Sequence, residues 1–162
     1  MRSIFKIFSL ITVLLLSIIA NATNYVVNTN ANLQSRISAA NPGDTVTVAN
    51  GTYSWGQISI TNTKGTSTSA WIVLRAETFN GVVFTGNTYL QFSAKRLLIT
   101  GFKFANGNSG YNDVIQFRNS SSVSADYCRL NNITIENYSS DTTGAASGAT
   151  VSDNKWVSIY GI

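Results

Sequence analysis

The chain has 162 residues, with no His, one Cys, one Pro and only 11% charged residues. Its net charge of +4 at pH 7 is too small for a nucleic-acid-binding protein, which needs a strongly basic patch. A length of this order suits one domain, and abundant Asn, Ser, Thr, Gly, Ile and Val favour strands and turns over helices.

The first segment predicts an export signal. Arg2 and Lys6 form a basic start, and an apolar run follows from Ile7 to Ala20. Ala20-Asn21-Ala22 then supplies the small-x-small pattern that a signal peptidase recognises. The run is shorter than the ~20 apolar residues of a membrane span, and no stop-transfer cluster follows it. We therefore expect a cleaved signal peptide over residues 1–22, no membrane span after its removal, and a secreted or periplasmic product.

A short strand, Tyr25-Val26-Val27, precedes a predicted helix. Asn32 is the expected N-cap of this helix, and Asn41-Pro42-Gly43 is expected to end it. Apolar residues recur at helical spacing at Leu33, Ile37 and Ala40. One small helix ahead of many strands is typical of a β-solenoid, in which it covers the exposed edge of the first coil.

The rest of the chain alternates between apolar and polar residues in short runs, which predict strands. These runs are Thr45–Val48, Gln57–Ile60, Trp71–Leu74, Val82–Phe84, Leu97–Ile99, Phe102–Phe104, Val114–Phe117, Ile133–Ile135 and Val157–Ile159. No run after Ala40 has the helical period that βαβ crossovers need. Alternation predicts inward side chains at Val46, Val48, Ile58, Ile60, Ile99, Phe102, Phe104, Ile115, Phe117, Ile133, Ile135, Val157 and Ile159.

An internal repeat favours a solenoid over a β-sandwich. Ile99–Asn106 matches Leu130–Asn137 in its apolar positions and its closing Asn, at an offset of 31 residues (99 to 130), within the roughly 20–50 of solenoids. Gly101 and Asn132 both tolerate the left-handed backbone of a coil corner. Sandwiches usually have tight hairpins, which the long connections here do not resemble. We therefore expect residues 23–162 to be all-β, a right-handed single-stranded parallel β-helix with a short N-terminal capping helix.

Several segments resemble known families. Leu33–Ile37, Asn41–Val46 and Asn50–Tyr53 resemble the opening of pectate-lyase-like β-helices. A narrower resemblance, to polysaccharide lyase family 6, is found in Gly65–Ala76, Val83–Asn87 and Leu98–Asn106. That family contains alginate lyases and chondroitinase B. A resemblance to the alginate lyase branch of this family is found in Val114–Asn119, Cys128–Leu130, Ile135–Tyr138 and Asn154–Gly161.

The resemblance implies β-elimination at a uronic acid. In the family, Ca²⁺ neutralises the substrate carboxylate, a Lys removes the C5 proton and an Arg lies near the glycosidic oxygen. The resemblance places these groups in later coils, so we assign no catalytic, cofactor-binding or metal residue here and expect Ca²⁺ only in the full-length protein. The final strand, Trp156–Ile162, has no cap, and we expect the chain to be an N-terminal fragment without activity of its own.

Other side chains are candidates for a site, but the sequence favours a structural interpretation of each. The scattered acids Asp113, Asp126, Asp141 and Asp153 are expected to be turn residues. Outward, solvated charges are expected at Lys95, Lys103 and Lys155. Arg118 and Arg129 could line a glycan groove, but solvent exposure or pairing with a carboxylate is favoured for both. Packing is favoured over sugar stacking for Tyr53, Trp55 and Trp71. The lone Cys128 is expected to pack between coils as a small apolar side chain.

Three functions remain open. The first is an exported family 6 lyase that acts on an acidic polysaccharide, alginate above all. The second is a non-catalytic β-helix that binds glycans or serves as an adhesin. The third is another pectate-lyase-like enzyme, such as a pectate lyase or a glycosidase. A Lys, an Arg and a Ca²⁺ cluster in further coils would support the first, and paired Asp residues would support a glycosidase.

Overall fold

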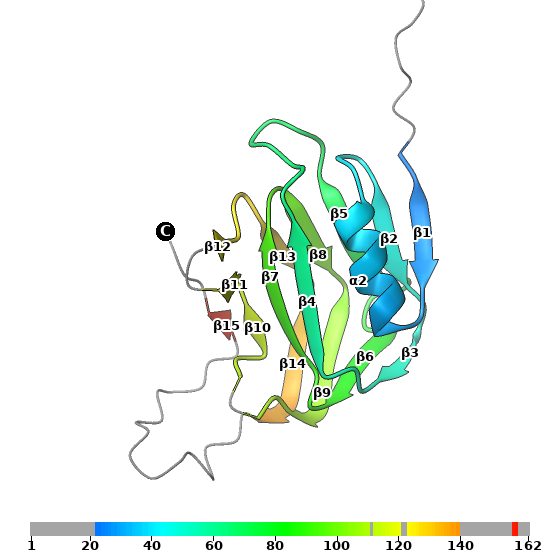
Figure 1. Ribbon diagram of the computed structural model, residues 1–162. Coiled ribbons are helices and arrows are strands. Elements are labelled where there is room, and N and C mark those ends of the chain that lie inside the picture. The colour runs from blue at the N-terminus through cyan, green and yellow to red at the C-terminus, as the bar shows by residue number, and fades with distance from the viewer. Residues whose placement is uncertain (1–21, 111, 121–122, 140–156, 159–162) are drawn as a thin grey trace, which may run out of the picture.

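The computed structural model describes residues 22–110, 112–120, 123–139 and 157–158, and the chain winds through three parallel sheets (Figure 1). Sheet A contains β1 (Asn24–Val27), β2 (Thr45–Val48), β5 (Ile72–Ala76), β8 (Leu97–Thr100) and β13 (Arg129–Asn131). Sheet B contains β3 (Gly51–Tyr53), β6 (Val82–Gly86), β9 (Phe102–Asn108) and β14 (Thr134–Ser139). Sheet C contains β4 (Gln57–Asn62), β7 (Tyr89–Ala94), β10 (Ile115–Gln116) and β15 (Val157–Ser158). Each coil visits sheets A, B and C in turn, which confirms the predicted parallel β-helix.

The internal repeat marks two stacked coils. Leu130 of β13 pairs with Ile99 of β8, and Ile135 of β14 pairs with Phe104 of β9. The corner residue between sheets A and B is left-handed in both coils, with φ of +86° at Gly101 and +51° at Asn132. Only Gly, and less readily Asn, adopts that backbone at low cost. The predicted register and corners are therefore confirmed.

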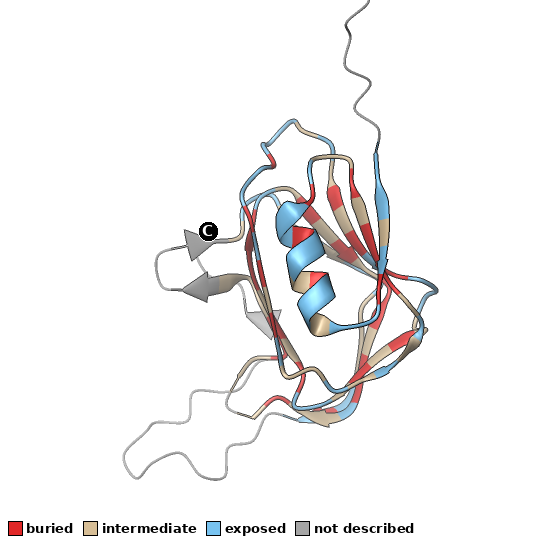
Figure 2. Ribbon diagram, turned by 45° about the vertical axis from the view of Figure 1, so that its right-hand side comes forward, coloured by how far each residue is buried: buried red, intermediate tan, exposed pale blue. Residues whose placement is uncertain are grey.

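The core lies between the three sheets, and Figure 2 colours the buried residues red. Predicted inward residues that are buried are Val46, Val48, Ile58, Ile60, Ile99, Phe102, Phe104 and Ile115. The others in the described chain, Phe117, Ile133 and Ile135, are half-buried and pack against this core. For Ile135 the reason is that β14 is the terminal strand of sheet B. The side chain of Val157 and the whole of Ile159 lie outside the described residues.

Helix α2 (Asn30–Ala39) packs on β4 and β2, with Leu33 and Ile37 buried beneath it. The predicted N-cap, Asn32, is wrong. Thr29 caps the helix, because its side-chain oxygen accepts the backbone N–H of Asn32 at 3.2 Å. At the other end Asn62 donates its side-chain amide to the carbonyls of Ile37 at 2.6 Å and Ala40 at 3.0 Å, which satisfies two carbonyls that a helix end leaves free.

Three strands and a hairpin fall outside the predicted runs, and most of the other strands differ from them by a few residues at one or both ends. Strands β3, β7 and β13 were not predicted, and β5 begins at Ile72, one residue after the predicted start. The strands β11 (Arg118–Ser120) and β12 (Val123–Ser124) form an antiparallel pair. Polar outward residues such as Gln91 lower the strand signal of β7, and its pairing with β4 supplies what propensity does not. No helix among the described residues is long and apolar enough to cross a membrane.

Candidate functional site

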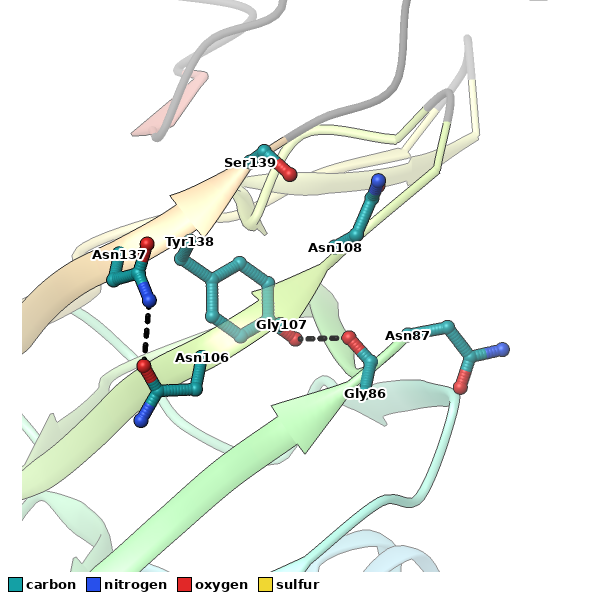
Figure 3. A pocket seen from close by; sticks show the side chains of 8 residues that line it. All are labelled: Gly86, Asn87, Asn106, Gly107, Asn108, Asn137, Tyr138 and Ser139. Atoms are coloured by element: carbon teal, nitrogen blue, oxygen red, sulfur yellow. Dashed lines mark hydrogen bonds between the residues drawn. The ribbon is translucent and has the colours of Figure 1, made fainter.

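An open hollow of about 750 Å³ lies at the carboxyl ends of β6, β9 and β14 in sheet B (Figure 3). Its lining residues are Gly86, Asn87, Asn106, Gly107, Asn108, Asn137, Tyr138 and Ser139. Parallel strands in register bring these side chains together, since Tyr138 pairs with Gly107 and Ser139 with Asn108. The hollow is therefore a direct product of coil stacking.

Two asparagines form a ladder along this hollow. The side-chain amide of Asn137 donates to the side-chain oxygen of Asn106 at 2.6 Å. Both residues have a left-handed backbone, with φ of +45° and +52°, and Asn is one of the few residues other than Gly that adopts it routinely. Both side chains are exposed. Each amide keeps further donor or acceptor capacity that can be turned toward a ligand.

Tyr138 forms the buried wall of the hollow. Its hydroxyl donates to the carbonyl of Thr88 at 2.5 Å and lies 3.2 Å from the carbonyl of Gly86, and its ring meets Phe104 edge-on. Burial raises the pKa of Tyr138 to about 12. The phenol is therefore protonated at neutral pH and is no general base there.

Gly107 makes room for that tyrosine. A Cβ on Gly107 would lie 2.4 Å from Cε2 of Tyr138 and 2.6 Å from the carbonyl oxygen of Gly86. Both approaches are closer than van der Waals contact permits, so a side chain at this position would displace the ring. The glycine is required here by close approach of neighbouring coils.

The chemistry of the hollow is neutral hydrogen bonding. Asparagine amides and backbone groups suit hydroxyl groups and ring oxygens of a sugar. Elimination at a uronate additionally requires a base and a positive charge that stabilises the developing anion. Among the described residues, no lysine, arginine, aspartate or glutamate lines this hollow. Its described lining offers neutral hydrogen-bonding groups and none of the charged groups that elimination requires.

The predicted charged residues lie elsewhere. Lys95 lies 3.9 Å from Asp126, and Lys103 forms an ion pair with Glu136. Both lysines point outward as expected, although each has a carboxylate partner. Asp113 is half-buried ahead of β10 and belongs to no cluster of metal-ligating side chains, and the described residues contain no such cluster. Asp141, Asp153 and Lys155 lie outside the described residues.

Two of the three aromatic candidates serve packing. The rings of Tyr53 and Trp55 lie 4.5 Å apart, and Trp55 lies 5.4 Å from the buried Phe84. The ring of Trp71 instead carries cations, with the guanidinium carbons of Arg96 and Arg129 at 4.4 and 5.3 Å from its centroid.

The remaining two candidates are Arg118 and Cys128. Arg118, half-buried, begins β11. Cys128 packs against the core with its sulfur 3.2 Å from the carbonyl oxygen of Ala94. Burial raises the pKa of Cys128 to about 11, so the thiol is neutral and a poor nucleophile. The expected packing role is confirmed.

Sequence reasoning missed the Asn106–Asn137 ladder and the part played by Arg96. A signal for the ladder existed, because these two residues close the two copies of the 31-residue repeat (106 to 137). Arg96 offered none, since its contact with Trp71 depends on the register between β5 and β8.

Comparisons with known proteins agree with each other. A family model described as chondroitinase B matches residues 27–161. Similar solved structures include the PL6 family alginate lyase AlyGC, with a TM-score of 0.60 and 26% identity over 69% of this chain. A mannuronic acid specific family 6 lyase from human gut microbiota has a TM-score of 0.63 and 26% identity over 71%. A PL6 family polysaccharide lyase from Pseudopedobacter saltans has a TM-score of 0.55 and 29% identity over 68%.

The matched region is a small part of those enzymes. It covers 15% of AlyGC, 26% of the gut enzyme and 24% of the Pseudopedobacter saltans enzyme. No curated protein matches the sequence significantly.

Proposed function

The chain belongs to the chondroitinase B family, and we propose that it supplies the N-terminal coils of an exported polysaccharide lyase that cleaves a uronate-containing glycan by β-elimination. The observation that carries this proposal is the family match over residues 27–161. A parallel β-helix by itself would not carry it, because one fold serves many functions.

Alginate is the proposed substrate. Two of the similar structures are described as an alginate lyase and a mannuronic acid specific lyase, and both share 26% identity with this chain. The segments that resemble the alginate lyase branch include Cys128–Leu130 and Ile135–Tyr138. Chondroitin and dermatan sulfate are the competing substrates within the same family.

We propose that glycan binding and catalysis are carried out by different coils, because the described lining of the hollow lacks the charged groups that catalysis needs. The described coils offer a hollow of neutral amides, which suits the hydroxyl groups of a sugar. Calcium takes six to eight oxygen ligands, and no three metal-ligating side chains cluster in the described part of the chain. That observation supports a Ca²⁺ site outside the described coils. We propose that Ca²⁺, the base and the catalytic cation are held by coils outside them.

An activity assay tests the proposal. The product of the complete reading frame that encodes this chain is incubated with poly-mannuronate, poly-guluronate, dermatan sulfate and pectate, with and without Ca²⁺. Elimination forms an unsaturated uronate that absorbs in the ultraviolet. We expect turnover of alginate by that product and none by the 162-residue chain. Cleavage of pectate alone, or turnover by the 162-residue chain, would contradict the proposal.

Export forms part of the same proposal. The basic start at Arg2 and the cleavage pattern Ala20-Asn21-Ala22, of which only Ala22 is among the described residues, support a mature N-terminus at Thr23. Mass spectrometry of the product from a periplasmic or culture fraction measures this directly. Retention of residues 1–22 in a membrane fraction would contradict it.

A second function is favoured by the neutral hollow. A non-catalytic β-helix that only binds glycan would need hydrogen-bonding groups and no base, and the described lining around Asn106 and Asn137 supplies such hydrogen-bonding groups. Binding of alginate by the complete product without any unsaturated uronate would favour this second function over the lyase.

A further inference from the structure

A cluster of two cations and one aromatic ring lies on the outer face of sheet A. Trp71 immediately precedes β5 and Arg96 immediately precedes β8, and these positions adjoin because Ile72 pairs with Leu97. Arg129 lies one coil further on, in β13, opposite Leu98. Their guanidinium carbons lie 4.4 Å (Arg96) and 5.3 Å (Arg129) from the centroid of the Trp71 ring.

Arg96 is held in an unusual backbone conformation. Its φ is +60°, which costs a residue with a Cβ about 1–2 kcal/mol. Neighbouring coils fix it there, because its N–H donates to the carbonyl of Asp126 and its own carbonyl accepts from Ile72, each at 3.0 Å. The side-chain Nε donates to the carbonyl of Ser69 at 3.0 Å. Strain that the surrounding structure maintains at a surface position is a reason to look for function.

No carboxylate of the described residues forms an ion pair with either guanidinium. The ion pairs within the described residues are Lys95–Asp126 and Lys103–Glu136, and both leave Arg96 and Arg129 without a counter-ion. Arg129 is exposed and Arg96 half-buried. Two cations beside one ring repel each other unless an anion lies between or beside them. The cluster is therefore suited to bind negative charge.

We propose that Trp71, Arg96 and Arg129 form a binding surface for the carboxylate groups of an acidic polysaccharide. Stacking on the indole holds each planar guanidinium by its face. Because Nε of Arg96 already donates to the carbonyl of Ser69, Arg96 would bind a carboxylate in a bidentate manner through its two Nη groups, and Arg129 through one of its N–H edges. Tyr127 follows Asp126 in the next coil, is 62% exposed and offers its ring to a sugar. The identity of the glycan, a polyuronate, rests on the proposed function.

Binding of a defined oligosaccharide tests this surface. The full chain is titrated with a mannuronate hexasaccharide by calorimetry at low and high salt, with cellohexaose as the uncharged ligand and dermatan sulfate as the sulfated one. Arg96→Gln/Arg129→Gln is expected to weaken mannuronate binding at least about tenfold, since charge-assisted hydrogen bonds contribute roughly that much each. Binding by the unaltered chain is expected to weaken with salt.

Arg36→Gln is the matched control. Arg36 also stacks on an aromatic ring, at 5.1 Å from the centroid of Tyr25, so this variant removes one charge and one cation–π contact from a different surface. We expect it to bind mannuronate within twofold of the unaltered chain. A double variant with lysine at both arginine positions is expected to keep part of the affinity, because it keeps the charge but loses the planar fork.

Results that contradict this proposal can be told apart from unfolding of a variant and from failure of the proposed lyase function. Thermal unfolding of every variant identifies one that has merely unfolded, and the lysine variant then carries the comparison. Unchanged binding by the double glutamine variant, equal loss in Arg36→Gln, equal affinity for cellohexaose, or tighter binding of dermatan sulfate would each overturn the proposal. This experiment measures binding and not turnover. The chain can therefore bind mannuronate through this surface even if the complete product does not cleave alginate, and the complete product can cleave alginate even if this surface does not bind it.

Discussion

Truncation of Phe104 should be among the most damaging changes in this protein. Its side chain is 1% exposed and packs against the rings of Phe84 at 5.2 Å and Tyr138 at 5.8 Å. Burial of a phenylalanine contributes about 1.5–3 kcal/mol, and each ring contact adds about 0.5–1.5 kcal/mol. The sum of these terms agrees with the usual cost of a Phe→Ala change in a well-packed core, which is about 3–5 kcal/mol. We expect Phe104→Ala to lower the free energy of unfolding by that amount.

Denaturant unfolding measures the effect. Circular dichroism follows the sheets, and tryptophan fluorescence follows the aromatic cluster, because Trp55 lies 5.4 Å from Phe84. Coincident transitions by the two probes would justify a two-state analysis, which a stack of coils does not guarantee. Phe79→Ala is the matched control, since Phe79 is 64% exposed and surface changes of this kind usually stay within about 0.5 kcal/mol.

The reasoning would be refuted by either of two results. A loss below about 1 kcal/mol in Phe104→Ala would mean that the ring does not occupy a packed core. An equal loss in Phe79→Ala would mean that burial does not decide the cost of removing a ring. Phe104→Leu separates ring contacts from volume, and we expect it to lie between Phe104→Ala and the unaltered protein.

Three further predictions concern local contacts. Gly107→Ala should destabilise by about 1–3 kcal/mol, as overpacking does, because its Cβ would meet the ring of Tyr138 at 2.4 Å; a neutral result in denaturant unfolding would show that the ring can move. Thr29→Ala should lose about 1 kcal/mol of helix stability while Asn32→Ala loses less, and the reverse order would restore Asn32 as the cap. Burial raises the pKa of Cys128 from 9.0 to about 11 and that of Tyr138 from 10.0 to about 12. The folded state therefore favours the protonated forms of both groups. The free energy of unfolding should keep its full value below pH 9 and fall as the pH rises from about 9 to 12. A free energy of unfolding that stays constant across that range would contradict this prediction.

Local signals were sufficient to predict the coil. The repeat that pairs Ile99 with Leu130, and Phe104 with Ile135, could be predicted because each strand alternates with period two and each corner needs a special backbone. Gly101 satisfies that backbone requirement without a side chain. These are properties of a few adjacent residues, and they survive in the sequence whatever the neighbouring coil contains.

Contacts between coils were not predictable in the same way. The number of residues from one coil to the next varies, as Val73 pairs with Leu98 but Leu98 pairs with Arg129. The partner of a given outward side chain therefore cannot be read from a fixed spacing. The two cations at Trp71 come from two different coils and could not be predicted for that reason. The sequence favoured a packing role for the tryptophan itself.

Coil stacking also limits the chemistry that one position can hold. Residues in register lie about 4.8 Å apart, so repetition of one residue type stacks like on like. Amides tolerate this, as in the ladder of Asn106 and Asn137 and in the row where Gln57 donates to Gln91 at 2.6 Å and Gln91 donates to Gln116. Like charges in such a row repel, and an ionised side chain needs a complementary neighbour. A lyase centre requires a base, a cation and metal ligands around one uronate, so neighbouring coils must differ at the same position. In the amide-lined hollow the ladder of Asn106 and Asn137 repeats one neutral residue type, which agrees with the proposal that catalytic groups lie in other coils.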